Sequence, residues 1–181
     1  MGKHKGKKAR ARRKSAWRGF GIFLLVLAVL AFLTLGARYF LWEPARIKTN
    51  AMSPAYYAGD TVLISKFISL DSVSRGDLVY AEFTSTGARL VRRLAGLQGD
   101  LVRVEADGKA YLDPSDGSET IPLGQAPMLT YGRIPQGAYL LLSDDLSDAS
   151  ALDSRTLGLV SGRSILGKPG SVIWPPNRAF K

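Results

Sequence analysis

The sequence predicts a mainly β protein, in which an antiparallel β domain follows one N-terminal transmembrane helix. One long apolar run, residues 19–37, contains no charged residue. After Pro44 the apolar residues stand in short runs rich in β-branched and aromatic residues, with Gly and Ser between them. No amphipathic segment of useful length with a 3.6-residue period follows residue 45. We expect a basic cytoplasmic tail at 1–18, a transmembrane signal anchor at 19–42 and an extracytoplasmic β domain at 43–181.

The tail supplies most of the net charge of +10. No acidic residue precedes Glu43, and the basic residues of the tail are Lys3, Lys5, Lys7, Lys8, Arg10, Arg12, Arg13, Lys14 and Arg18. A nucleic-acid-binding arm has such charges too. These charges border an apolar segment, however, which favours a topology signal and no nucleic-acid partner. By the positive-inside rule the tail stays in the cytoplasm.

The apolar run GFGIFLLVLAVLAFLTLGA is long enough to cross a lipid bilayer. As a helix it spans about 28 Å, close to the roughly 30 Å of a hydrocarbon core. Trp17 on one side and Tyr39, Phe40 and Trp42 on the other suit the two interfaces. A cleavable signal is the alternative, but its apolar core usually has about 7–15 residues. We therefore expect an uncleaved anchor.

The β domain is expected to contain strands at 61–65, 78–83, 101–105, 110–112, 138–142 and 172–174. Asp107-Gly108 predicts a hairpin with a two-residue type I′ turn, because that turn needs positive φ values. Residues 113–133 are rich in turn formers, and little order is expected there.

The lack of cysteine and the position of the one histidine limit the catalytic chemistry that the folded part can carry out. The chain has no cysteine, which excludes disulfides, thiolate nucleophiles and Cys-based metal sites. Its one histidine, His4, lies in the tail, so the folded part cannot contain a Ser-His-Asp triad. No metal or other cofactor is expected.

The segment after the anchor, Thr49 to Asp60, reads TNAMSPAYYAGD. It resembles the nucleophile segment of the bacterial type I signal peptidases, Ser-Gly-Ser-Met-x-Pro-Thr-Leu-x-x-Gly-Asp. Met52, Pro54, Gly59 and Asp60 match that pattern. The middle serine is the family's nucleophile, and Ala51 stands in its place.

Three later segments extend the resemblance over nearly all of residues 44–181. They are Arg75-Gly76-Asp77 with its following strand, Leu90 to Asp100, and Pro135 to Val160 with its Asp153-Ser154-Arg155 box. The resemblance implies a signal-peptidase-type β fold and a single-pass protein of the bacterial cell (inner) membrane. It also implies a Ser–Lys dyad that cleaves signal peptides from secreted preproteins.

The dyad's lysine is replaced by Arg92. A guanidinium, whose pKa exceeds about 12, does not deprotonate in proteins and cannot act as the general base. A structural role for Arg92, as a surface residue or in an ion pair with Asp153, is the alternative. Ala151 stands where the family has a serine that orients the lysine, although a two-residue insertion makes this third departure less well aligned.

The resemblance assigns roles to several other residues. Thr49 falls on the serine that donates to the oxyanion hole, unless it is only a turn hydroxyl. Met52, Ser53 and Tyr56 are expected to bind substrate, and Met52, Tyr56 and Tyr57 to form an apolar lip, unless they pack in the core. Asp153 and Arg155 are expected to form a structural salt bridge. The glycines at 59, 96, 99 and 158 are expected to serve turns or close packing.

Two functions follow. The first is an inactive homologue that binds signal or pilin-like segments in export or surface assembly, with an active paralogue or the export machinery as a further partner. The second is an active serine endopeptidase with an atypical site, for example Ser53 with Lys66. That serine lies two residues from the nucleophile position, about 6–7 Å away in a strand. Ala51 and Arg92 together favour the first function, and Arg92 also argues against Ala51 as a single engineered substitution.

Overall fold

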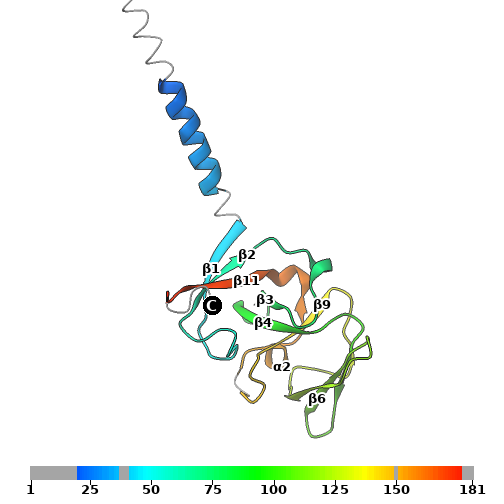
Figure 1. Ribbon diagram of the computed structural model, residues 1–181. Helices are drawn as coiled ribbons and strands as arrows, with labels where there is room; N and C mark the ends of the chain where they lie inside the picture. The colour runs from blue at the N-terminus through cyan, green and yellow to red at the C-terminus, as the bar shows by residue number, and fades with distance from the viewer. Residues whose placement is uncertain (1–19, 37–40, 149–150, 177–181) are drawn as a thin grey trace, which may run out of the picture. The chain divides into compact units, whose positions relative to one another are not determined.

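The computed structural model describes residues 20–36, 41–148 and 151–176 (Figure 1). The chain divides into two units, Met1–Leu41 and Trp42–Lys181. In the first unit residues 20–36 are helical. Within the described residues, no helix combines the length and apolarity that crossing a membrane requires. The basic tail, Trp17, Tyr39 and Phe40 lie outside the described residues.

The second unit is built on two antiparallel sheets, as the sequence predicts. The larger sheet has the strand order β1-β2-β11-β3-β4-β9-β10. Its strands are β1 (Trp42–Arg46), β2 (Thr61–Ser65), β3 (Leu78–Phe83), β4 (Ala88–Gly96), β9 (Ala138–Leu142), β10 (Val160–Ser161) and β11 (Ile165–Trp174). In β2 the side chains alternate, so that Val62 and Ile64 are fully buried between partly exposed neighbours.

Trp42, which the sequence placed at the end of the anchor, begins the sheet. It pairs with Ser65 of β2, and the register continues to Arg46 opposite Thr61. The β domain therefore starts with the residue expected to close the anchor.

The smaller sheet contradicts the expectation that residues 113–133 have little order. Its order is β7-β6-β5-β8, with β5 (Leu101–Val104), β6 (Lys109–Asp113), β7 (Ile121–Gln125) and β8 (Gly132–Arg133). Leu123 of β7 is buried in a cluster with Leu112 and Leu140. Pro122 is compatible with β7 because this strand lies at a sheet edge, where a missing N–H is tolerated. Tertiary burial therefore orders a segment that turn chemistry alone leaves open.

The predicted hairpin joins β5 to β6, but its turn is longer than expected. Gly108 N donates to Glu105 O at 3.0 Å, and Glu105 N donates to Lys109 O at 2.8 Å. Three residues, rather than two, therefore separate the paired positions. Gly108 has φ 81°, the left-handed conformation with which a three-residue hairpin loop ends.

Helices are short in the second unit, in line with the absence of a long amphipathic segment. They are α2 (Ser154–Leu157) and the 3₁₀ turns η1 (Leu70–Ser72) and η2 (Gly162–Ser164). Side chains from β1, β2, β3, β4 and β11 share one core, which includes Ile47, Met52, Tyr56 and Val91. The segment between β1 and β2 is thus packed against the middle of β4.

The glycines at 59, 96, 99 and 158 all have the expected roles. Gly99, with φ 89°, lies in a turn, and Gly158, with φ 85°, is the C-cap of α2. Gly59 has φ 94° and lies in a turn before β2. At Gly96 an added Cβ would lie 2.6 Å from Ile134 and 2.8 Å from Leu140, so a side chain has no room.

Candidate functional site

Ala51, which the resemblance places at the nucleophile position, is buried and held by its backbone. It is 3% exposed. Its carbonyl oxygen accepts hydrogen bonds from the backbone N–H groups of Asp144 (2.8 Å) and Asp145 (3.2 Å), in the loop after β9. Its methyl side chain has no atom that can attack a carbonyl carbon.

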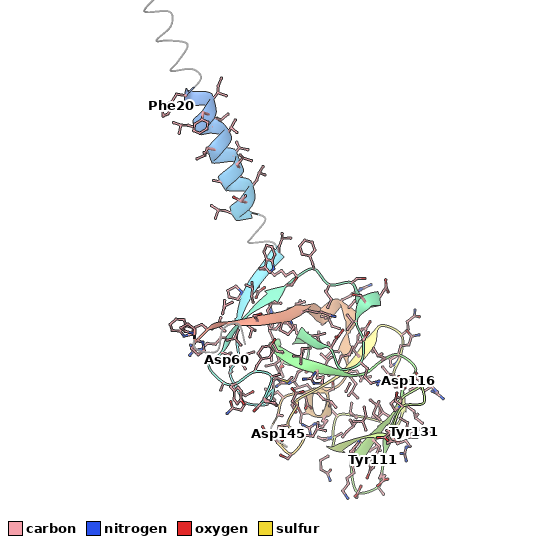
Figure 2. The ribbon with its side chains drawn as sticks, in the orientation of Figure 1. Phe20, Asp60, Tyr111, Asp116, Tyr131 and Asp145 are labelled. Carbon is pink, nitrogen blue, oxygen red and sulfur yellow. The ribbon has the colours of Figure 1, made fainter. Side chains whose placement is uncertain are left out.

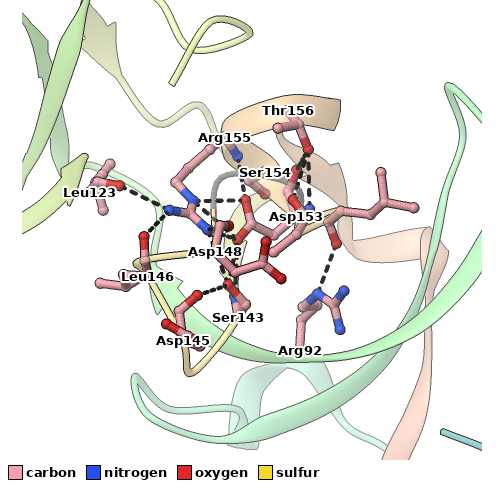
Figure 3. Close-up of polar contacts among 12 residues, drawn as sticks. Arg92, Leu123, Ser143, Asp145, Leu146, Asp148, Asp153, Ser154, Arg155 and Thr156 are labelled. Carbon is pink, nitrogen blue, oxygen red and sulfur yellow. Dashed lines mark hydrogen bonds and ion pairs between the residues drawn. The ribbon is translucent and has the colours of Figure 1, made fainter. Parts of the chain in front are cut away.

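Arg92, which the resemblance places at the general-base position, is a buried cation fixed by carbonyl oxygens. It is 4% exposed. Its Nε donates to Leu152 O at 2.8 Å (Figure 3). Its Nη1 donates to Val91 O at 2.7 Å. Nη2 has no acceptor among the described residues. Burial lowers the pKa of the guanidinium from its ordinary value, while the charge of Asp153 opposes that shift.

The partners of Arg92 are therefore main-chain oxygens, and not the carboxylate or the solvent that the structural alternatives expected. Within the part of the chain that the structure describes, no carboxylate lies within ion-pair distance of it, and its side chain is not on the surface. A surface position is wrong because Arg92 is buried. An ion pair with Asp153 is wrong because Asp153 pairs with another arginine.

That arginine is Arg155, and the predicted salt bridge is confirmed. Its Nη2 lies 2.8 Å from Asp153 Oδ2, and both side chains are buried. Ser143 Oγ also donates to Asp153 Oδ2 at 2.9 Å, and Arg155 N donates to Oδ1, which caps α2 (Figure 3). The pair thus holds the end of β9 to α2. Asp153 directly follows Leu152, whose carbonyl oxygen accepts the hydrogen bond from Arg92.

A cavity of about 200 Å³ lies beside Arg92. Its two main walls are residues 45–49, at the end of β1, and residues 88–92 of β4; Met52, Tyr80 and Leu152 complete it. Thr49 also lines this cavity and is exposed. β4 pairs with β9 only from Arg93 onward, and β1 pairs only with β2 among the described strands. The edge of β1 away from β2 and the edge of residues 88–92 away from β3 therefore have no strand partner among the described residues.

The residues expected to bind substrate separate in the structure. Met52 lines the cavity but is only 1% exposed, and Tyr56 is buried in the same core with its hydroxyl donating to Gly170 O at 2.7 Å. An apolar lip of Met52 and Tyr56 is therefore wrong; Tyr57, 38% exposed, is the one of the three that reaches the surface. The core alternative applies because Met52 and Tyr56 pack in the core that side chains of β1, β2, β3, β4 and β11 share.

Ser53 faces a different cavity. That space, of about 650 Å³, is lined by Ser53, Arg93 and Asp144, among others. Arg93 Nε lies 2.6 Å from Asp144 Oδ1. Lys66, the other member of the alternative dyad, pairs with Glu43 at 3.0 Å, and no hydrogen bond joins it to Ser53 within the described residues. The structure therefore does not bring Ser53 to Arg92 or to Lys66.

The sequence did not predict that Arg92 and its neighbour Arg93 serve two different cavities. Arg92 and Arg93 follow one another in β4, so their side chains leave opposite faces of the sheet. Arg92 lines the cavity of about 200 Å³, and Arg93 pairs with Asp144 beside the cavity of about 650 Å³. The strand period could have separated them, but the carbonyl of Leu152 as the partner of Arg92 had no sequence signal. No group of three or more His, Cys, Asp or Glu side chains suited to a metal occurs among the described residues.

Fold and site together define a mainly antiparallel β protein with a small cavity between two open strand edges. The chain belongs to the signal peptidase, peptidase S26 family, whose model matches residues 18–174. Its sequence is 27% identical to signal peptidase I of Bacillus amyloliquefaciens, over 91% of this chain and 89% of that protein. It is 29% identical to signal peptidase I T of Bacillus subtilis, over 84% and 83% of the two chains.

A solved structure was also matched. The crystal structure of a signal peptidase I from Enterococcus faecalis aligns with 22% identity and a TM-score of 0.41, over 55% of this chain and 98% of that one.

Proposed function

We propose that this chain is a non-cleaving signal peptidase homologue that binds signal or pilin-like segments in the cavity between β1 and β4. The observation that carries the proposal is the environment of Arg92. A buried guanidinium that donates hydrogen bonds to Leu152 O and Val91 O occupies the position of the general base. It has no lone pair with which to accept a proton. Ala51 independently removes the nucleophile, so each position alone prevents the dyad chemistry.

Binding does not need the dyad. The open edges of residues 45–49 and 88–92 offer backbone donors and acceptors to an extended segment, as in β-strand addition. Ala45, Ile47 and Val91 supply apolar walls between them. A cavity of about 200 Å³ suits small side chains, in keeping with the small residues that the resemblance implies at −1 and −3 of a signal peptide.

The setting we propose is the bacterial cell membrane. Residues 19–42 anchor the chain in the lipid bilayer, the basic tail stays in the cytoplasm, and the β domain meets exported segments outside. Secretory preproteins or pilin-like proteins are the partners, with an active paralogue or the export machinery completing the process. The charge of the tail and the apolar run support this arrangement.

Photocrosslinking tests the binding role. A photoreactive residue at Thr49, which is exposed and lines the cavity, should crosslink to a peptide that spans a signal-peptide cleavage junction. A bulky side chain at −1 of the peptide should weaken the crosslink. The matched control places the same group at Tyr131, which is 70% exposed at the end of the domain that carries the smaller sheet (Figure 2).

The same samples report on cleavage. The peptide should remain intact in the unmodified protein. Equal crosslinking from Thr49 and Tyr131 would remove the support for a binding cavity. Cleavage that disappears in Ser53→Ala would instead establish the active alternative.

A further inference from the structure

We propose that the cavity beside Arg92 recognises a free C-terminal carboxylate, so that its ligand is a released signal peptide ending in a small residue rather than an uncut preprotein. This inference rests on the proposed function, because it names which form of the signal segment the same cavity prefers.

The first support is the charge of the cavity wall. Arg46, Lys48, Arg89 and Arg92 all line it, and no acidic residue does. Arg89 is already paired, with its Nε 2.8 Å from Glu82 Oε2. The other three have no ion pair with any described residue. An uncharged peptide bond would leave these cations as they are, whereas a carboxylate would supply the missing negative charge.

The second support is the burial of Arg92. The charges of Asp153, Asp144 and Asp148 act on Arg92, but none of these carboxylates forms an ion pair with it. A buried cation without an ion pair is costly, and hydrogen bonds to neutral carbonyls offset only part of that cost. Two of its three nitrogens are used by Leu152 O and Val91 O, and Nη2 has no acceptor among the described residues. Guanidinium–carboxylate hydrogen bonds are short and strong because both groups are ionised. The site is therefore pre-organised for an anion at the position where the family holds a neutral base.

The third support is size. Pockets that enclose a whole drug-sized ligand measure about 300–1,000 Å³, and this one has about 200 Å³. It suits the last residue or two of a chain. Ala45, Met52 and Val91 form the apolar wall that a small final side chain would contact. An anionic lipid also combines an acid with an apolar part, but its two acyl chains exceed this volume.

The test compares two peptides that differ in one group. The full-length protein in detergent micelles is titrated with a fluorescent signal peptide ending in Ala-x-Ala, once with a free carboxylate and once with a C-terminal amide. The free acid should bind at least about tenfold more tightly, the range expected for hydrogen bonds to a charged group. Arg92→Met should abolish that difference, and Arg92→Lys should retain part of it.

Further variants keep the test independent of folding at the buried position. Arg46→Gln and Lys48→Gln alter exposed cations of the same cavity and should each reduce the preference for the acid. Arg163→Gln is the matched control, since Arg163 is exposed in η2 and does not line the cavity.

The outcomes separate the two proposals. Equal binding of acid and amide would overturn the carboxylate inference and leave the proposed function intact, and a preference unchanged in Arg46→Gln, Lys48→Gln and Arg92→Met would also overturn it. No binding of either peptide would overturn both. If phosphatidylglycerol vesicles bound through Arg92 and displaced the acid peptide, a lipid headgroup would be the ligand and the peptide inference would be wrong.

Discussion

The Nε of Arg92 donates to the carbonyl oxygen of Leu152 at 2.8 Å, and this bond ties the middle of β4 to the segment just before α2. In a Ser–Lys peptidase the side chain at this position moves a proton. Here the same position acts as a fixed donor, since its buried cation is held by main-chain oxygens. In the proposed function, this site therefore binds a signal segment without the two side chains that cleavage needs.

Restoring the dyad requires both positions. Ala51→Ser alone should leave a preprotein uncut because Arg92 cannot accept the proton, and Arg92→Lys alone should fail for want of a nucleophile. The double variant should cleave slowly, because burial lowers the pKa of a lysine and favours its neutral form. A general base contributes roughly 10²–10⁴-fold, so cleavage should exceed that of Ala51→Ser by about this factor. Gel analysis of a preprotein with an Ala-x-Ala site measures it, and cleavage by Ala51→Ser alone would contradict the role given to Arg92.

The Asp153–Arg155 pair should dominate the stability of the site. Asp153→Ala removes one partner of a fully buried pair and also the cap of α2. Leaving Arg155 buried and unpaired should cost about 3–5 kcal/mol of unfolding free energy. The measurement is chemical denaturation of the full chain in detergent. Asp113→Ala, which breaks an exposed pair with Arg103, is the control and should shift the midpoint far less. Similar shifts for both variants would show that burial does not set the cost.

Asp100 should make the domain sensitive to acid. Burial alone would raise the pKa of its carboxyl, but hydrogen bonds from Arg75 and from the backbone N–H groups of Leu97 and Ser115 outweigh burial and lower it. A carboxyl whose folded pKa is depressed stabilises the fold above its unfolded pKa of about 3.9. That contribution is lost as the pH falls through the folded pKa.

Denaturation of Asp100→Asn at two pH values tests this. The variant should be less stable than the unmodified protein at pH 7, and the difference should shrink at about pH 3, below the unfolded value. A difference that stayed constant between the two pH values would mean that packing, not ionisation, accounts for the contribution of Asp100.

The proposed membrane topology follows from charge asymmetry. A reporter that is active only outside the cytoplasm, fused after Lys181, should be active. Neutralising the basic residues of the tail at 1–18 should reduce that activity, because the positive-inside bias would be removed. Activity of a cytoplasm-only reporter at the same junction would reject the topology.

The sequence by itself determined the fold class and predicted the loss of the dyad. Short runs rich in β-branched and aromatic residues place the strands at 61–65, 78–83 and 138–142 as the structure has them. Ala51 and Arg92 need no geometry to be recognised, because a methyl group cannot attack and a guanidinium cannot accept a proton.

Only the tertiary structure decided what these residues do instead. Leu152 lies sixty positions after Arg92. Its carbonyl reaches Arg92 because the neighbouring Asp153–Arg155 pair holds this loop in place. β7 forms because Leu123 meets Leu112 in a core that no local pattern specifies. Met52 and Tyr56 are core residues because they pack against side chains from five strands that are distant in the sequence. These features depend on contacts between distant segments, whose energies are set by burial rather than by the residues' own preferences.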